Sequence, residues 1–332
     1  MVERERRWVA TGGDPIHCVN TWQETRVSWR MRLAIPAVLM LAALGCSKAS
    51  PRAPAANRDA AQAPQAPPAQ PAPQPLPDGP LGISVRRGLA LIEHTPDSLP
   101  QFVGSNLRCT SCHLDRGLRD NAAPLTGVHA RYPRYVDRAG AVVLIEDRVN
   151  YCFTRSLAGR ALPPRSTEMV DIVAYLGFIS RGPVGKVEPN LPTHSADSAR
   201  GAAVYASTCS RCHGLDGAGV QATPAVWGAR SYSIGASMAR VGRAAAFIRR
   251  NMPLDRAGTL TDQQAFDVAA FINSHARPDL PGKSLDWPSG NAPADVPYAT
   301  RGHTPAHAIP TIARSGSAAA PVPVPVSVRH QR

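Results

Sequence analysis

The chain is poor in aromatic residues and in lysine. The first shortage limits how much of the chain can form packed core, and the second bears on the kind of partner that its positive charge would bind. Aromatic side chains make up 5% of 332 residues and prolines number 33, so we do not expect most of the chain to lie in packed core. Only three lysines occur, so the formal charge of +13 comes almost entirely from arginine. No basic patch falls on a recognisable nucleic-acid-binding module, and we therefore expect no nucleic-acid partner.

The sequence also lacks a hydrophobic run long enough to span a membrane. The longest one, Ala34–Leu44, follows Met31 and Arg32 and ends at Gly45-Cys46. A basic start, a short apolar stretch and small residues are typical of a secretory signal, which makes 1–46 a leader segment. Its end resembles a bacterial lipoprotein cleavage site, which predicts a lipid on Cys46 and a periplasmic protein anchored to the outer membrane. Ordinary cleavage or an uncleaved anchor are the alternatives, and translation from Met31 would remove residues 1–30.

Seven cysteines leave no obvious pair for a structural disulfide, because four of them fall in two pentapeptides. These are Cys109-Thr110-Ser111-Cys112-His113 and, 100 residues later, Cys209-Ser210-Arg211-Cys212-His213. C-x-x-C-H is the attachment signature of a c-type heme. We therefore predict two covalently attached hemes c, with His113 and His213 as iron ligands. A dithiol or zinc site is the alternative, and it leaves the adjacent histidines unexplained.

Helical periodicity places each motif between an opening and a closing helix. The expected helices span 84–94 and 167–180 around the first motif, and 196–208 and 261–275 around the second. This layout resembles a class I cytochrome c domain, so the predicted fold is mainly α, with domains at 81–182 and 195–278. The segments 171–176 and 267–272 match, which indicates a degenerate tandem repeat.

The remaining segments have compositions that do not favour a core of their own. Residues 47–80 are rich in Ala, Pro and Gln and bury too little surface to offset the entropy of ordering. We expect a tether there, a linker at 183–194, an extension at 279–300 and a disordered tail at 301–332.

The candidates for the sixth iron ligand differ between the two domains. Met252 lies 39 residues after His213, and Cys152 lies 39 residues after His113. The shared spacing predicts a His/Met heme in the second domain and a His/Cys heme in the first. Met238 competes with Met252. In the first domain the alternatives are an inert buried cysteine and a ligand from His129, while Met169 falls inside the closing helix.

The two predicted ligand sets give the hemes different roles. A thiolate ligand stabilises ferric iron and methionine raises the potential, so electrons are expected to pass from the first heme to the second. A thiolate is also a nucleophile and is not needed for plain electron transfer, which indicates sulfur chemistry at Cys152.

Four longer segments resemble the diheme thiosulfate dehydrogenases. They are APLTGVHARYPRY (123–135), EDRVNYCFTRSLAGRALP (146–163), SYSIGASMARVGRAAAFIRRNMPL (231–254) and DVAAFINSHARP (267–278). The resemblance covers about 81–300. It implies two class I-type domains and a pocket at the His/Cys heme where two thiosulfates couple to tetrathionate. The two electrons would leave through the second heme to a soluble or membrane-bound cytochrome or copper protein.

Arginines near Cys152 suit a substrate of this charge. Two dianions repel each other when they meet, and guanidinium groups bind sulfonate oxygens well. The candidate substrate contacts are Arg131, Arg134, Arg148, Arg155 and Ser111. For each arginine the alternative is a surface charge or a partner for a heme propionate.

Two positions depart from the family pattern. Arg134 stands where relatives are expected to carry an uncharged residue. Asn251 precedes Met252 where some relatives carry a lysine that competes for the iron, so no ligand switch is expected here.

The prediction is therefore an oxidoreductase that uses thiosulfate and tetrathionate, with the physiological direction left open. A diheme electron carrier without its own substrate is the alternative. A cysteine S-transferase subunit of the sulfur-oxidising multienzyme system is a third possibility, but the second heme domain favours the self-contained enzyme.

Overall fold

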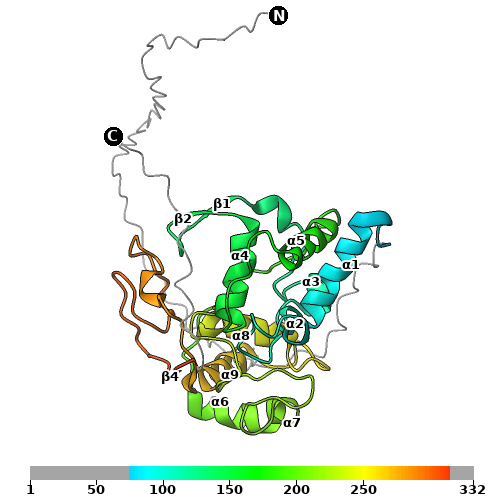
Figure 1. Ribbon diagram of the computed structural model, residues 1–332. Coiled ribbons are helices and arrows are strands. Elements are labelled where there is room, and N and C mark those ends of the chain that lie inside the picture. Colours follow the sequence, from blue (N-terminus) through cyan, green and yellow to red (C-terminus); the bar gives the residue numbers. More distant parts are fainter. Residues whose placement is uncertain (1–74, 315–332) are drawn as a thin grey trace, which may run out of the picture. The chain divides into compact units, whose positions relative to one another are not determined.

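The computed structural model describes residues 75–314. The predicted leader, the lipid site at Cys46, most of the tether and residues 315–332 lie outside that range. The described helices are α1 (Gly79–Glu93), α2 (Thr95–Ser98), α3 (Leu114–Gly117), α4 (Ile145–Tyr151), α5 (Thr167–Ile179), α6 (Ser198–Val204), α7 (Ser210–His213), α8 (Val241–Asn251) and α9 (Asp262–Ser274) (Figure 1). Within this range no helix has both the length and the hydropathy to cross a bilayer.

Short segments complete the secondary structure. Two π-helical turns, η3 (Cys152–Ser156) and η4 (Tyr205–Cys209), continue α4 and α6. The 3₁₀ turns are η1 (Cys109–Ser111), η2 (His129–Arg131), η5 (Ser237–Ala239) and η6 (Lys283–Leu285). Strands β1 (Arg134–Val136) and β2 (Ala141–Val143) form an antiparallel hairpin, whereas β3 (Arg277–Pro278) and β4 (Thr311–Ile312) pair in parallel.

The predicted opening and closing helices are present, and local sequence explains their ends. The Ser166 hydroxyl caps α5 by accepting from the Met169 amide, and Thr261 and Gln264 form a capping box at the start of α9. Helix α1 begins at Gly79, earlier than predicted, because Pro80 in its first turn favours a helix start.

The tandem repeat is visible in how each pair of helices crosses. Helix α1 packs on α5, and α6 packs on α9 (Figure 1). A Cβ on Gly88 would lie 2.0 Å from the Asp171 carbonyl oxygen, and one on Gly201 would lie 2.0 Å from that of Asp267. Each crossing therefore requires glycine. In both domains an ion pair also joins the opening helix to the closing helix. Arg87 pairs with Asp171, and Arg200 pairs with Asp267.

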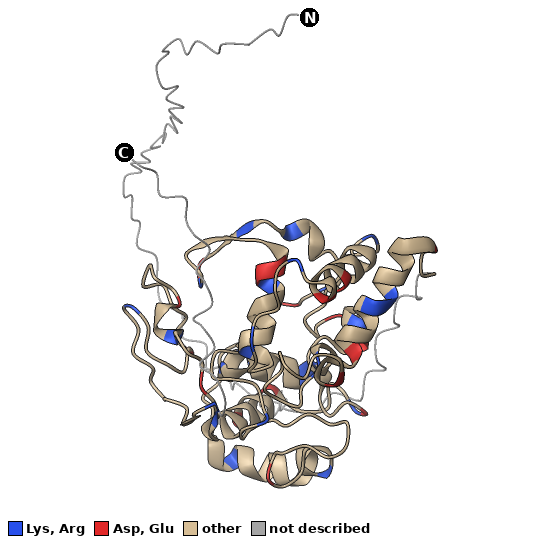
Figure 2. Cartoon of the chain, in the orientation of Figure 1, with Lys and Arg blue, Asp and Glu red and all other residues tan. Residues whose placement is uncertain are grey.

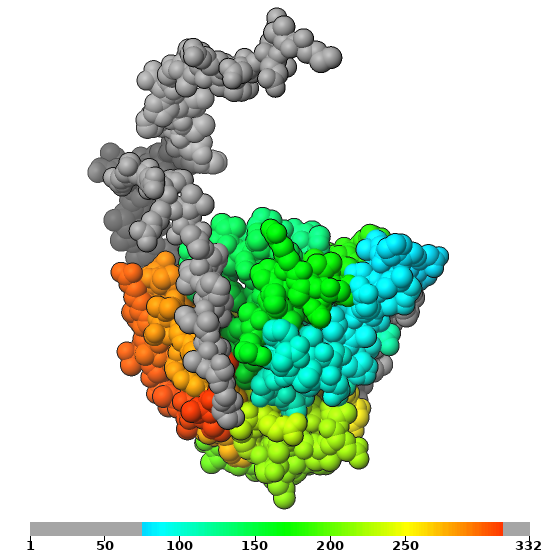
Figure 3. All heavy atoms as spheres, viewed as in Figure 1, coloured from blue at the N-terminus to red at the C-terminus, as the bar shows by residue number. Residues whose placement is uncertain are grey.

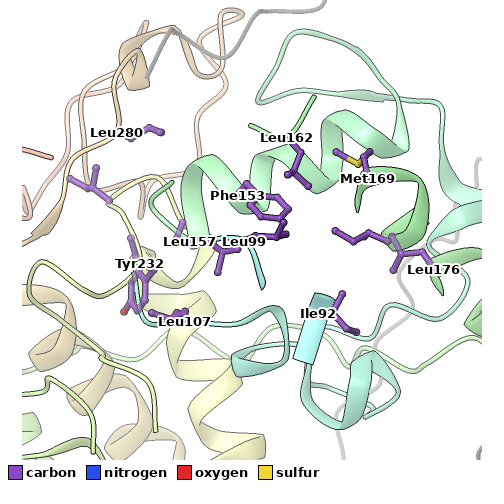
Figure 4. Close-up of a cluster of buried hydrophobic side chains, with 14 of the residues drawn as sticks. Ile92, Leu99, Leu107, Phe153, Leu157, Leu162, Met169, Leu176, Tyr232 and Leu280 are labelled. Carbon is purple, nitrogen blue, oxygen red and sulfur yellow. The ribbon is translucent and has the colours of Figure 1, made fainter. Parts of the chain in front are cut away.

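One of the two hydrophobic cores extends beyond its predicted domain boundary. The second core lies between α6, α8 and α9. The first core, part of which Figure 4 shows, includes Phe153 and Leu162 but also Tyr232 from the second domain and Leu280 from the extension. The loop 228–240 and the extension thus help to bury the first domain's apolar side chains.

The disordered tail begins later than predicted, so the prediction is wrong for residues 301–314. Strand β4 pairs with β3, and Ile309 is buried in the first core. Arg314 donates to the carbonyl oxygens of Thr154, Gly159 and Asp279. These long-range contacts order a segment whose composition alone indicates disorder, and Figure 3 shows it in orange and red as part of the packed surface.

Candidate active site

A cavity in the first domain contains the heme motif and Cys152 together. The empty space between its walls is about 620 Å³, open solvent at the mouth included. Cys109, Cys112, His113 and Cys152 all line it. The rest of the lining is mostly apolar and comes from Ile92, Leu107, Leu125, Val149, Phe153, Leu157, Ile172 and Leu176.

The motif side of this cavity fits a covalently bound heme c. The amide of Cys109 donates to the hydroxyl of buried Thr95 at 3.1 Å, which fixes the first thiol. His113 Nδ1 lies 2.5 Å from the carbonyl oxygen of Ala123. That contact occupies Nδ1 and leaves Nε2 as the nitrogen for iron. The two thiols, the oriented imidazole and the apolar walls are the features such a heme requires.

Cys152 begins a π-helical turn, and Arg148 lies one turn before it on α4. Arg148 Nη1 donates to Cys152 Sγ at 3.0 Å. Single π turns inside helices are frequent at functional sites because they redirect side chains. The structure thus brings Cys152 and Arg148 together at the cavity, while iron ligation by Cys152 stays a prediction.

The three sulfurs of this cavity have different electrostatic surroundings. Burial raises the pKa of Cys109 and of Cys112 to about 12. Burial would also raise the pKa of Cys152, but Arg148 and His113 outweigh it and lower the pKa to about 6. Of these three thiols, only Cys152 is placed to be a thiolate at neutral pH, which is the form that binds metals and attacks sulfur.

Arg155 has a different position from the one predicted for a substrate contact. It lies in η3, but its two terminal nitrogens donate to the Asp286 carboxylate at 2.8 and 2.7 Å. Arg138 Nε and the Tyr298 hydroxyl donate to the same carboxylate at 3.0 and 2.6 Å. Because both ends of the Arg155 fork are paired and buried, the residue anchors the turn of Cys152 to the C-terminal extension instead of facing the cavity.

The other predicted contacts lie outside the cavity lining. Arg131 donates to the carbonyl oxygens of Thr126 and Gly127, and Arg134 is exposed on β1. The Ser111 hydroxyl accepts from the Arg108 amide at 3.1 Å. Figure 2 shows basic residues on several elements, among them α1, α4 and α6.

Sequence reasoning missed two polar residues that do line the cavity. Arg108 immediately precedes the first motif, and Ser156 lies four residues after Cys152 at the end of η3. The four-residue step from Cys152 was a usable signal, since it places both side chains on similar faces of a helical turn.

The second heme motif has a similar arrangement around its histidine. His213 Nδ1 lies 2.9 Å from the Pro224 carbonyl oxygen. Met252 caps the end of α8 and packs, half-buried, against the second core. Met238, its competitor, packs against both cores. Asn251 donates through its amide to the Asn121 and Phe247 carbonyl oxygens, so its side chain contributes to packing between the domains.

Family models match both halves of the described chain. Residues 103–184 match the SoxA/TsdA cytochrome c domain, and residues 196–272 match subunit III of cbb3-type cytochrome c oxidase. These matches agree with the fold predicted for each domain and imply heme c in both.

This chain aligns with most of the length of several curated thiosulfate dehydrogenases. It is 42% identical to a thiosulfate dehydrogenase of Allochromatium vinosum over 61% of this chain and 82% of that protein. It is 39% identical to one of Psychrobacter arcticus over 67% and 72%. The SoxA subunit of an L-cysteine S-thiosulfotransferase from Rhodovulum sulfidophilum is 29% identical over 32% of this chain and 37% of that protein.

A solved structure has the same fold. The thiosulfate dehydrogenase TsdBA of Marichromatium purpuratum superimposes with a TM-score of 0.61 at 36% identity, over 64% of this chain and half of that one. With two matching domain models and relatives above 30% identity along most of their length, the chain belongs to the thiosulfate dehydrogenase family of cytochrome c oxidoreductases.

Proposed function

We propose that this protein couples two thiosulfates to tetrathionate and releases two electrons through two covalently held hemes c. The contact from Arg148 Nη1 to Cys152 Sγ, at the edge of the first heme cavity, is the observation that carries the proposal. The names of the relatives support thiosulfate as the substrate. The same residues would serve thiosulfate oxidation and the reverse reaction, the reduction of tetrathionate.

Two sets of residues would hold the hemes. In the first domain, Cys109 and Cys112 would attach the heme, and His113 and Cys152, which line the same cavity, would be its iron ligands. In the second, the attachment residues are Cys209 and Cys212, with His213 and Met252 as ligands. When bound, the hemes supply one-electron acceptors that together take the two electrons of the reaction.

Cys152 and Arg148 would carry the sulfur chemistry. The Cys152 sulfur would form a bond with the outer sulfur of one thiosulfate, a two-electron oxidation for which the bound hemes would be the electron acceptors. The outer sulfur of a second thiosulfate then attacks the sulfur bound to Cys152. The new sulfur–sulfur bond makes tetrathionate, and the Cys152 thiolate leaves, so that the two thiosulfates lose two electrons in total.

The charges around the cavity suit dianionic substrates. Arg148 stabilises the Cys152 thiolate, and Arg108 adds a second guanidinium at the cavity wall. Since two dianions at 4 Å repel strongly in any medium less polar than water, both cations lower the cost of bringing two thiosulfates together. Ser156 is a further hydrogen-bond donor on the same wall.

We further propose a periplasmic protein held at the outer membrane by a lipid on Cys46. The leader-like segment 1–46 and the tether-like composition of 47–80 support this. The electron acceptor would be a cytochrome or a copper protein. Intact mass of the purified protein tests the anchor, because a mass without a diacylglycerol would rule it out.

Two other functions explain fewer features. A substrate-free electron carrier has no use for a thiolate beside an arginine in its heme cavity. A cysteine S-transferase subunit would fit the first domain, but the match to SoxA covers only 112 residues.

Thiosulfate-dependent heme reduction, with ferricyanide as a terminal acceptor, tests the proposal. We expect turnover by the wild type, and we expect Cys152→Gly to abolish it while both hemes stay attached. Full activity in this variant would remove Cys152 from the mechanism, and no turnover of any sulfur compound by the wild type would favour the carrier.

A further inference from the structure

The turn that carries Cys152 has one carbonyl oxygen, that of Thr154, which the amides following the turn do not reach. The amides of residues 157, 158 and 159 donate to the carbonyl oxygens of Cys152, Arg155 and Phe153, in that order. Thr154 is 4% exposed, and a buried backbone carbonyl without a donor costs free energy. This oxygen therefore requires a donor from elsewhere in the chain.

Arg314 supplies that donor and contacts two more carbonyl oxygens around the same turn. Its Nη2 donates to the Thr154 oxygen at 2.7 Å, its Nη1 to that of Gly159 at 2.9 Å, and its Nε to that of Asp279 at 3.0 Å. A guanidinium is planar and rigid, so it fixes these three carbonyl groups relative to one another. A cation at the carbonyl end of a helix is also favoured by the helix dipole, and α4 with η3 ends here.

The segment that presents Arg314 is itself anchored to the body of the protein. Strand β4 pairs with β3, and the Asp279 amide donates to the Ile312 carbonyl oxygen at 3.0 Å. Ile309 is buried in the first core. The three hydrogen bonds of Arg314 therefore tie the turn of Cys152 to a fixed segment.

The turn presents two sides, and Arg314 holds the outer one. Four residues of the turn and its end line the heme cavity, namely Cys152, Phe153, Ser156 and Leu157. On the outer side, the Arg155 side chain pairs with Asp286 and the Thr154 carbonyl oxygen accepts from Arg314. Thr154 is two residues from Cys152, so a movement of its peptide group passes directly to the residue that carries the sulfur.

We propose that Arg314 is a positioning residue for Cys152. By holding the carbonyl groups of Thr154 and Gly159, it fixes where the Cys152 sulfur lies in the first heme cavity and keeps it beside Arg148. Arg314 lies beyond residues 81–300, over which the sequence resembles the family, so the proposal gives a segment outside that resemblance a part in the reaction. It rests on the role of Cys152 in the proposed function.

Steady-state thiosulfate oxidation by the full-length holoprotein tests this role. In Arg314→Gln we expect kcat to fall by about 10- to 100-fold, because a displacement of about 1 Å at a reacting group can cost about 100-fold. KM should change little, since Arg148 and Arg108 stay at the cavity. Arg314→Lys keeps a donor without the planar group and should give an intermediate kcat. Arg301→Gln is the matched control, because Arg301 is exposed, contacts only the Pro288 carbonyl oxygen and should leave kcat unchanged.

Electron paramagnetic resonance of the oxidised holoprotein gives a readout that does not need turnover, because the signal of each heme depends on its own axial ligands. We expect the signal of the first heme to shift or split in Arg314→Gln and that of the second heme to stay as in wild type. The lysine variant is read in the same way if the glutamine variant does not fold.

Two results would overturn the proposal. One is a wild-type kcat together with a wild-type signal of the first heme in Arg314→Gln. The other is an equal change at both hemes, which would indicate a general loss of structure. If the wild type oxidised no thiosulfate, the proposed function would fail, and the signal of the first heme alone would then decide whether Arg314 positions Cys152.

Discussion

Replacing Asp286 with asparagine is expected to destabilise the protein strongly, because this carboxylate anchors the turn of Cys152. The Asp286 side chain is 6% exposed and pairs with Arg155 and Arg138, whose side chains are 11% and 16% exposed. Tyr298 donates a further hydrogen bond to it. Asparagine has nearly the same shape, so the change removes the charge with little effect on packing and leaves two buried guanidinium groups without an anion.

The size of the effect follows from this burial. Removing one partner of a buried ion pair costs about 3–5 kcal/mol of unfolding free energy. The Asp279–Lys283 pair of the same extension provides a control, since its side chains are 33% and 29% exposed. Exposed pairs contribute about 0–1 kcal/mol, so Asp279→Asn is expected to have a small effect.

The same carboxylate predicts a dependence on pH. Burial would raise the pKa of Asp286, but Arg138, Arg155 and the Tyr298 hydroxyl outweigh it and lower the pKa below its ordinary value, which is about 3.9. A lowered carboxyl pKa adds stability above the ordinary value, and that stability is lost as the pH falls through the lowered pKa. The difference between wild type and Asp286→Asn should therefore shrink below about pH 4.

Denaturant unfolding followed by circular dichroism, at neutral pH and at acid pH, measures both effects. The heme spectrum would report displacement of the turn that carries Cys152, because such a displacement should weaken any thiolate signature at the first heme. If Asp286→Asn lost no more stability than Asp279→Asn, or if the difference from wild type persisted unchanged in acid, the buried ion pair would not have the role described here.

Two further predictions concern the hemes' surroundings. Arg148→Gln removes the cation beside the Cys152 sulfur, so thiosulfate turnover should fall by about 100-fold, as for the loss of one donor at a charged transition state. The exposed control Arg165→Gln should keep turnover within about twofold, and equal losses in steady-state assays would argue against a local role for Arg148. Met252→Ala should remove the methionine signature of the second heme in near-infrared spectra while Met238→Ala keeps it, and the reverse pattern would identify Met238 as the ligand.

The sequence was sufficient to predict features that depend on local patterns and on the repeat. The helices α5 and α9 lie where apolar spacing and the caps at Ser166 and Thr261 place them. The match between 171–176 and 267–272 reappears as two equivalent helix crossings. The shared 39-residue spacing indicated that Cys152 lies near the first motif, and both line the same cavity.

Features that depend on distant pairing were not predictable in this way. Arg155 and Asp286 are 131 residues apart, and nothing near Arg155 in the sequence indicates that an extension supplies its counter-ion. The ordered residues up to Arg314 depend on β3 and on backbone carbonyls around Cys152. Helix α8 (Val241–Asn251) is not among the helices expected from the sequence, although its buried residues Ala244, Ala245, Ile248 and Asn251 recur at helical spacing.

The repeated helix crossings make each heme domain an internal reference for the other. Gly88 with Asp171 and Gly201 with Asp267 fix the same backbone approach on both sides of the chain, and each motif histidine is oriented by a carbonyl oxygen. Differences between the two hemes would therefore come from the parts that the domains do not share. These include the ligand candidates Cys152 and Met252 and the extension that packs into the first core, so the spectrum of one heme would calibrate that of the other within a single molecule.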